Sequence, residues 1–301
     1  MNTAPVLPAA QATPSRHWIA PYGAGGVALV AVSWAIAWSH VRPWSDETFF
    51  PLWLGYIITV DALVRPRLGR SLFQAGARRV ALVFAASAAV WWLFELFNVR
   101  VDNWHYTHAS PVGPLRFAIE ASIDFSTVLP AIFETTALIH TILPGSRELS
   151  RDLPALPSWA AWASIGAGIT FMVLPMAWPG IFFSLVWVSL FFLVDPINAR
   201  MGLPSLLAAI LAGRPRPALV LATAGITCGF FWEMWNYLSM PKWTYSVPLI
   251  PQQKLFEMPL LGYSGYLPFA LECFALYTLV SYAWRRNDGR QGPAEAFVPL
   301  D

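Results

Sequence analysis

The chain has 301 residues, of which 56% are hydrophobic and only 12% are charged, and it contains 16 Trp and 20 Phe. Soluble domains carry about 25% charged residues, so this composition excludes an ordinary soluble protein and predicts an integral membrane protein. The formal net charge is +2, and the lack of any block of like charge argues against a nucleic-acid partner. The two cysteines, Cys228 and Cys273, indicate neither a disulfide framework nor a thiolate metal site.

The predicted elements begin after a flexible polar lead at residues 1–15. A membrane-spanning helix needs about 20 apolar residues, and eight segments meet this requirement. They cover approximately residues 20–40, 48–65, 80–98, 122–143, 158–177, 180–197, 217–238 and 264–284. The expected fold class is therefore an all-α polytopic integral membrane protein with about eight transmembrane helices. Residues 147–154 are expected to form a linker, and residues 288–301 a disordered tail.

The distribution of Lys and Arg predicts the orientation of these helices. With the amino terminus inside, 14 of the 19 Lys and Arg residues fall in segments on that side and 5 on the other. Cytoplasmic loops hold the excess of these residues, so both termini are expected in the cytoplasm, and the membrane is expected to be a bacterial inner membrane. The loops with Trp104-x-Tyr106 and Trp243-x-Tyr245 then lie on the opposite side.

The chain repeats one sequence pattern. Glu233 follows Glu95 by 138 residues, and Asn236 follows Asn98 by the same distance. Further pairs 134 to 139 residues apart are Trp44 and Trp178, Trp53 and Trp187, Asp61 and Asp195, Trp104 and Trp243, Tyr106 and Tyr245, Glu120 and Glu257, Pro130 and Pro268, and Glu134 and Glu272. Such an offset across four helices preserves their directions, so the sequence predicts two parallel four-helix repeats, residues 16–146 and 155–287.

Carboxyl groups within predicted membrane helices are costly and mark functional sites. The candidate catalytic residues are the repeated acids Glu95, Glu233, Glu120, Glu257, Glu134 and Glu272. Asn98 and Asn236 share a helix face with Glu95 and Glu233 at i, i+3 and are expected to orient them. The candidate substrate-binding residues are these two asparagines with Trp104, Tyr106, Trp243, Tyr245, Trp92 and Trp232.

Two further pairs of repeated residues lie elsewhere in the predicted helices. Pro130 and Pro268 each precede a glutamate by four residues, which predicts a kinked turn with a freed carbonyl group. This turn is expected at a depth similar to that of Glu95 and Glu233, so that all the repeated acids converge on one water-poor chamber. Asp61 and Asp195 fall near cytoplasmic helix ends, where ion pairing is expected.

Three functions are compatible with this pattern. Carboxyls buried without Lys or Arg beside them favour the protonated form, which can protonate a C=C bond or an epoxide of a lipophilic substrate. Aromatic faces can stabilise the resulting cation. Alternatively, the same oxygens could bind a proton or a hard cation in a transporter or channel, or the chain could be a non-catalytic membrane scaffold. The expected partners are a lipophilic small molecule and membrane lipid, with no metal and no cofactor.

The pattern of acids and aromatic residues resembles one family of membrane enzymes. Glu95, Trp104-His-Tyr106-Thr and Glu120 in the first half, and Glu233, Trp243-Thr-Tyr245-Ser and Glu257 in the second, are similar to heterodimer-type lycopene cyclases and the related carotenoid hydratases. The resemblance covers about 40 residues in each half, and neither copy contains the Pro-x-Glu-Glu of the cyclases. It implies acid-catalysed cyclisation, isomerisation or hydration of an isoprenoid such as a carotenoid.

Overall fold

A computed structural model describes residues 19–143, 155–249 and 251–287 of the chain. The predicted lead at 1–15, linker at 147–154 and tail at 288–301 lie outside the described residues. The described part is mostly helical, as predicted.

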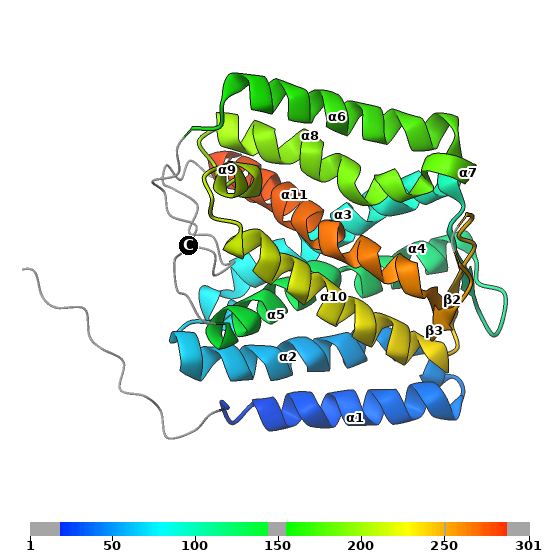
Figure 1. The fold of residues 1–301 in the computed structure, drawn as a ribbon. Coiled ribbons are helices and arrows are strands. Elements are labelled where there is room, and N and C mark those ends of the chain that lie inside the picture. Colours follow the sequence, from blue (N-terminus) through cyan, green and yellow to red (C-terminus); the bar gives the residue numbers. More distant parts are fainter. Residues whose placement is uncertain (1–18, 144–154, 250, 288–301) are drawn as a thin grey trace, which may run out of the picture.

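The long α-helices pack side by side, with α10 and α11 inclined to α1 and α2 (Figure 1). Their bounds are α1 Gly23–Ser39, α2 Phe49–Leu68, α3 Ala77–Val101, α4 Pro114–Phe125, α5 Val128–Ile142, α6 Ser158–Ala177, α7 Pro179–Phe182, α8 Val186–Arg200, α9 Leu206–Leu211, α10 Arg216–Tyr237 and α11 Tyr266–Asn287. Short 3-10 helices join them: η1 Trp44–Glu47, η2 Leu72–Ala75, η3 Phe183–Leu185 and η4 Leu260–Gly265.

Seven helical stretches of the described residues are long and apolar enough to cross a membrane. They are α2, α3, α4 with α5, α6, α7 to α8, α10, and η4 with α11. The first predicted span is a shorter apolar helix, α1, of 17 residues. The architecture therefore agrees with the predicted class of an all-α membrane protein.

Small residues allow α1 and α2 to pack closely. A Cβ atom added at Gly26 would lie 2.8 Å from the backbone nitrogen of Thr59 and 2.9 Å from the carbonyl oxygen of Gly55. Helices in membranes commonly associate through such small residues, because dispersion contacts must replace the hydrophobic effect between them. Substitution of Gly26 would separate the two helices.

Two pairs of short strands, which the sequence pattern did not indicate, lie at one end of the helices. The strands are β1 Trp104–Thr107, β2 Lys242–Tyr245, β3 Lys254–Leu255 and β4 Met258–Pro259. β1 pairs with β2 and β3 pairs with β4, both antiparallel. We call the β1–β2 pair the ribbon. The end of the bundle that carries it is called the ribbon end, and the opposite end, which includes η2 and α9, is called the far end (Figure 1).

A break between α4 and α5 confirms the predicted interruption near Pro130. α4 ends at Phe125, and Pro130 is the third residue of α5. Ser87 of α3 fills the break, because its hydroxyl donates to the carbonyl of Phe125 at 2.6 Å and accepts from the backbone N–H of Leu129 at 2.9 Å. Ser87 therefore partners two backbone groups that the interrupted helix leaves free.

Candidate active site beneath the ribbon

Four aromatic side chains share one face of the ribbon. Trp104 pairs with Tyr245, and Tyr106 pairs with Trp243. Side chains alternate between the two faces of a strand, and directly paired residues share a face. The ribbon therefore turns all four rings to the same side, and it joins segments about 140 residues apart in the chain.

The carboxyl of Glu95, six residues before the end of α3, accepts three hydrogen bonds on one oxygen. The donors are the indole N–H groups of Trp91 at 3.0 Å and Trp104 at 2.9 Å, and the hydroxyl of Tyr106 at 2.6 Å. Burial, followed by the nearby Glu95 carboxyl, raises the pKa of Tyr106 well above its usual value. The Tyr106 hydroxyl therefore keeps its proton and remains a donor at neutral pH.

Glu233 of α10 has a similar set of donors. The hydroxyls of Tyr245 and Tyr266 each donate to its Oε1 at 2.6 Å, and the indole of Trp243 lies 3.5 Å from the same atom. Its Oε2 is buried and has no hydrogen-bond partner. Burial and the Glu233 carboxyl raise the pKa of Tyr245 well above its usual value. Glu95 and Glu233 are thus each held by aromatic donors from the same face of the ribbon.

Asn98 and Asn236 attach the ribbon to the helix ends. The side-chain amide of Asn98 donates to the carbonyl of Trp104 at 2.7 Å and accepts from the backbone N–H of Asn103 at 2.9 Å. Asn236 makes both corresponding bonds with the backbone of Trp243, each at 2.8 Å. These amides were expected to orient the carboxyls, and their hydrogen bonds in the structure go to the backbone of the strands whose side chains contact the carboxyls.

Aromatic rings surround the two glutamates. Trp187 of α8 stacks on Phe94, with ring centroids 5.3 Å apart, and contacts Trp104 at 5.4 Å. In the corresponding place, Trp53 of α2 contacts Trp232 at 5.0 Å. The predicted residue Trp92 instead donates to the hydroxyl of Ser122 on α4 at 2.9 Å. Trp232 and Trp104 thus belong to the aromatic wall, whereas Trp92 faces α4.

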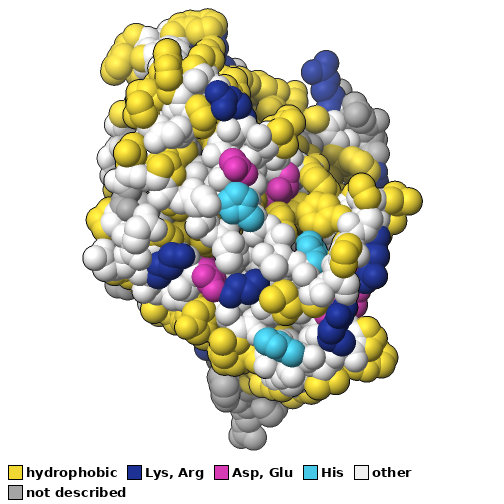
Figure 2. Space-filling view, turned by 90° about the vertical axis from the view of Figure 1, so that its right-hand side faces the viewer, with side chains coloured by type: hydrophobic (Ala, Val, Ile, Leu, Met, Phe, Trp, Pro, Cys, Tyr) yellow, Lys and Arg dark blue, Asp and Glu magenta, His cyan; other side chains and the backbone are white. Residues whose placement is uncertain are grey.

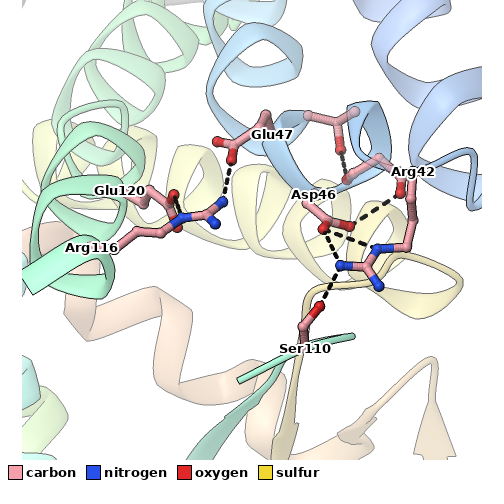
Figure 3. Close-up of polar contacts among 8 residues, drawn as sticks. Arg42, Asp46, Glu47, Ser110, Arg116 and Glu120 are labelled. Atoms are coloured by element: carbon pink, nitrogen blue, oxygen red, sulfur yellow. Dashed lines mark hydrogen bonds and ion pairs between the residues drawn. The ribbon is translucent and has the colours of Figure 1, made fainter. Parts of the chain in front are cut away.

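Glu120 and Glu257 form ion pairs at the ribbon end. In Figure 3, Arg116 of α4 lies between Glu120 and Glu47, bonding to Glu47 at 3.0 Å. The same view shows Arg42 paired with Asp46 at 3.0 Å. Glu257, between β3 and β4, pairs with Lys242 of the ribbon. These two acids therefore have basic partners, unlike Glu95 and Glu233, whose partners are neutral donors.

The prediction that Glu134 lies at the depth of Glu95 is wrong. Glu134 accepts from the backbone N–H of Leu72 at 3.0 Å, and Leu72 begins η2 at the far end, where α3 starts. Its span begins at Pro114 rather than at residue 122, which shifts Glu134 away from the ribbon.

Glu272 also lies apart from the ribbon, accepting from the N–H of Leu190 within α8 at 2.8 Å. Both Glu134 and Glu272 are fully buried, and the Oε2 atom of each has no hydrogen-bond partner. The six acids therefore separate into three pairs and do not share one chamber.

Asp61 and Asp195 accept bonds from helix-terminal N–H groups, which corrects the expectation of ion pairing. Asp195 accepts from the Ser205 hydroxyl at 2.6 Å and from the N–H groups of Leu206 and Leu207 at 2.9 Å each, and so holds the start of α9. Asp61 accepts from the N–H of Phe73 at 2.9 Å.

Asp61 also accepts from the hydroxyl of Tyr22, just before α1. Burial, followed by this bond to Asp61, raises the pKa of Tyr22 to about 12. Both aspartates therefore hold the connections at the far end of the bundle.

Two of the side chains that donate hydrogen bonds to Glu95 or Glu233 were not predicted. Trp91 lies four residues before Glu95 on the same helix, so its i, i+4 spacing could have indicated the contact. Tyr266 reaches Glu233 from another helix, and no sequence spacing signals that contact. Within the described ranges, no three His, Cys, Asp or Glu side chains are placed to hold a metal ion.

The surface at the ribbon end carries charged and histidine side chains near its centre and many hydrophobic ones around its edge (Figure 2). One hollow of about 380 Å³ is lined by residues 108–112 and Phe117. A second, of about 490 Å³, is lined by residues 113–116, Ile119 and Glu120 and is almost wholly apolar. Both lie along the β1–α4 loop and the start of α4.

No protein-family model matches the chain, and neither a curated protein nor a solved structure matches it.

Proposed function

We propose that the protein is an intramembrane enzyme that uses the carboxyls beneath the ribbon for acid–base chemistry on a lipophilic, isoprenoid-like substrate. The observation that carries the proposal is the shared arrangement of Glu95 and Glu233, each held by Trp and Tyr donors from one face of the ribbon. The donors all bond to one oxygen, Oε1, so they fix the orientation of each carboxyl and leave its other oxygen for proton transfer. The repeat of this arrangement supports two parallel halves.

The proposed reaction begins with proton transfer from a carboxyl to one carbon of a C=C bond. The alkene electron pair forms the new C–H bond, and the adjacent carbon becomes a cation. Indole and phenol rings around the site stabilise that cation. Loss of a neighbouring proton to the carboxylate completes an isomerisation. In a cyclisation, the electron pair of a second C=C bond of the substrate first attacks the cation and forms the ring bond, and the new cation then loses a proton to the carboxylate. Addition of water to the first cation and loss of a proton from that water completes a hydration. Neither route requires a metal or redox cofactor.

The ion pairs favour Glu95 and Glu233 over the other candidates. Glu120 and Glu257 are each engaged by a basic side chain, Arg116 and Lys242, whereas the carboxyls of Glu95 and Glu233 meet neutral donors. We assign these two acids a role in fastening the ribbon end. We place that end on the non-cytoplasmic side of a bacterial inner membrane, in agreement with the distribution of Lys and Arg.

The test compares lipid extracts of cells that express the wild-type chain with extracts from cells that express the double variant Glu95→Gln, Glu233→Gln. Mass spectrometry should detect a lipophilic product with the wild-type chain only. Glu120→Gln serves as the matched control and should retain the product. A product that persists in the double variant at the same membrane level of protein would contradict the proposal.

A second candidate function is proton- or cation-coupled transport. The Oε2 atoms of Glu134 and Glu272 favour it, because they are buried without a hydrogen-bond partner and could therefore bind a proton or a cation inside the bundle. Transport predicts ion-dependent flux in liposomes that Glu134→Gln abolishes. A scaffold function, in contrast, predicts that every one of these substitutions is tolerated.

A further inference from the structure

The two glutamates beneath the ribbon differ in exposure. Glu233 is completely buried, whereas Glu95 is only partly buried. The residue after Glu95, Leu96, is 67% exposed, so α3 presents this turn to the surroundings of the bundle. A carboxyl that reacts with a substrate must be accessible to it, and the complete burial of Glu233 leaves no path from the surroundings to its carboxyl.

A short series of contacts connects Glu95 with the surface. Tyr106, which donates to Glu95, has its ring 5.8 Å from that of Phe117. Phe117 lines the hollow beneath the β1–α4 loop, and its ring also contacts those of Trp92 and His108. The ring of Phe117 is therefore the wall between the hollow and the Tyr106–Glu95 pair.

The surroundings of this hollow suit a lipophilic molecule. Next to it, the apolar hollow at the start of α4 includes Leu115 and Ile119, which are 76% and 55% exposed. These residues are one helical turn apart and form an apolar stripe on the outside of the bundle. A chain dissolved in the lipid can follow this stripe to Phe117.

We infer that the two half-sites are not equivalent: Glu95 is the carboxyl that meets a lipophilic alkene substrate, and Phe117 controls access to it from the side of α4. Glu233 then acts as a positioning residue, which holds Tyr245 and Tyr266 and thereby the second strand of the ribbon. This inference rests on the proposed function for the nature of the substrate. The difference in access between the two glutamates can be measured without that substrate.

The experiment treats membranes containing the full chain with dicyclohexylcarbodiimide, a lipophilic reagent. A carboxyl O–H adds across one of its C=N bonds, and rearrangement leaves a stable acylurea without loss of any group. Peptide mass spectrometry over time then gives the labelling rate of each glutamate. We expect Glu95 to be labelled several-fold faster than Glu233. Equal rates, a faster rate at Glu233, or no label at Glu95 would each overturn the inference.

Variants of Phe117 test its role. Phe117→Ala should raise the labelling rate of Glu95 several-fold, and Phe117→Leu, which is less disruptive to folding, should raise it less. The matched control is Phe256→Ala in the second half, because Phe256 precedes Glu257 and contacts Phe230 and not Tyr106. An unchanged Glu95 rate in both folded Phe117 variants would contradict the assignment.

Product formation separates this inference from the proposed function. Glu95→Gln should abolish the product, whereas Glu233→Gln should retain part of it in protein that remains folded. Loss of the product in Glu233→Gln and not in Glu95→Gln would overturn the inference while leaving the proposed function in place. Retention of the product in the double variant would remove the function and leave the labelling result as a statement about access alone.

Discussion

Trp104 and Tyr245 lie directly opposite each other in the ribbon, and each donates a hydrogen bond to a different glutamate. The indole of Trp104 bonds to Glu95 at 2.9 Å, and the hydroxyl of Tyr245 bonds to Glu233 at 2.6 Å. One pair of cross-strand neighbours therefore links α3 to α10. Movement of the ribbon would alter the surroundings of both carboxyls together.

The first prediction concerns the Tyr245 hydroxyl. Tyr245→Phe removes a donor to buried Glu233 and should lower the free energy of unfolding by about 1–3 kcal/mol. Because the pKa of Tyr245 is raised in the folded protein, the contribution of this hydroxyl is present below about pH 10 and falls as the pH rises toward the raised value. Thermal unfolding in detergent measures the effect. Tyr237→Phe, at an exposed position, should leave stability unchanged; equal losses in the two variants would contradict the prediction.

The second prediction is that loss of the Ser87 hydroxyl lowers the free energy of unfolding more than loss of the Ser126 hydroxyl. Ser87→Ala leaves the carbonyl of Phe125 and the N–H of Leu129 without their partner in a buried position, at a cost of about 1–3 kcal/mol. The matched variant is Ser126→Ala, which lies in the same break and bonds only within its own turn. A midpoint of unfolding that falls in Ser87→Ala and not in Ser126→Ala is the expected result. No difference between them would show that Ser87 does not support the break.

Asp195 is predicted to hold α9 in place. Asp195→Ala removes the acceptor for three donors and should cost about 1–3 kcal/mol for each N–H left buried without a partner. Limited proteolysis should then cut the chain near α9 faster than in the wild type. Asp102→Ala, whose side chain is 81% exposed, is the control and should not change the cleavage rate. Unchanged cleavage in Asp195→Ala would refute this role.

Pairing of the two strands can be tested by cross-linking. His105 and Thr244 are opposite each other on the ribbon face that points away from the aromatic residues, and such neighbours have Cβ atoms about 4.5–5.5 Å apart. The variant His105→Cys, Thr244→Cys should form a disulfide on mild oxidation, detected as a linked peptide pair by mass spectrometry. Variants that carry only one of the two substitutions provide the controls. Failure to form the link would argue against this register.

Much of the helical framework could be predicted from the sequence, because apolar runs such as those around Glu95 and Glu233 are long and clearly bounded. The i, i+3 spacing also placed Asn98 beside Glu95 on one helix face. What the spacing could not show is that the amide of Asn98 bonds to the strand after the helix. Short-range spacing identifies the residues that share a helix face. Their hydrogen-bond partners depend on the path of the segment that follows the helix, which spacing does not reveal.

The ribbon and the depth of Glu134 were not predictable for physical reasons. Pairing of Trp104 with Tyr245 joins residues 141 positions apart, and local propensity carries no information about such contacts. The depth expected for Glu134 depends on a span that starts at residue 122. The span begins at Pro114 and contains a break, so Glu134 lies about two turns of helix further from the ribbon than predicted.

The most direct test of the account follows the proton itself. Purified protein in D₂O is incubated with the lipid fraction that accumulates in cells expressing the Glu95→Gln variant, and the product is analysed by mass spectrometry. Proton transfer from a carboxyl that exchanges with solvent predicts a carbon-bound deuterium in the product, and no product with the double variant Glu95→Gln, Glu233→Gln. A product formed without deuterium, or formed equally well by the double variant, would contradict the account.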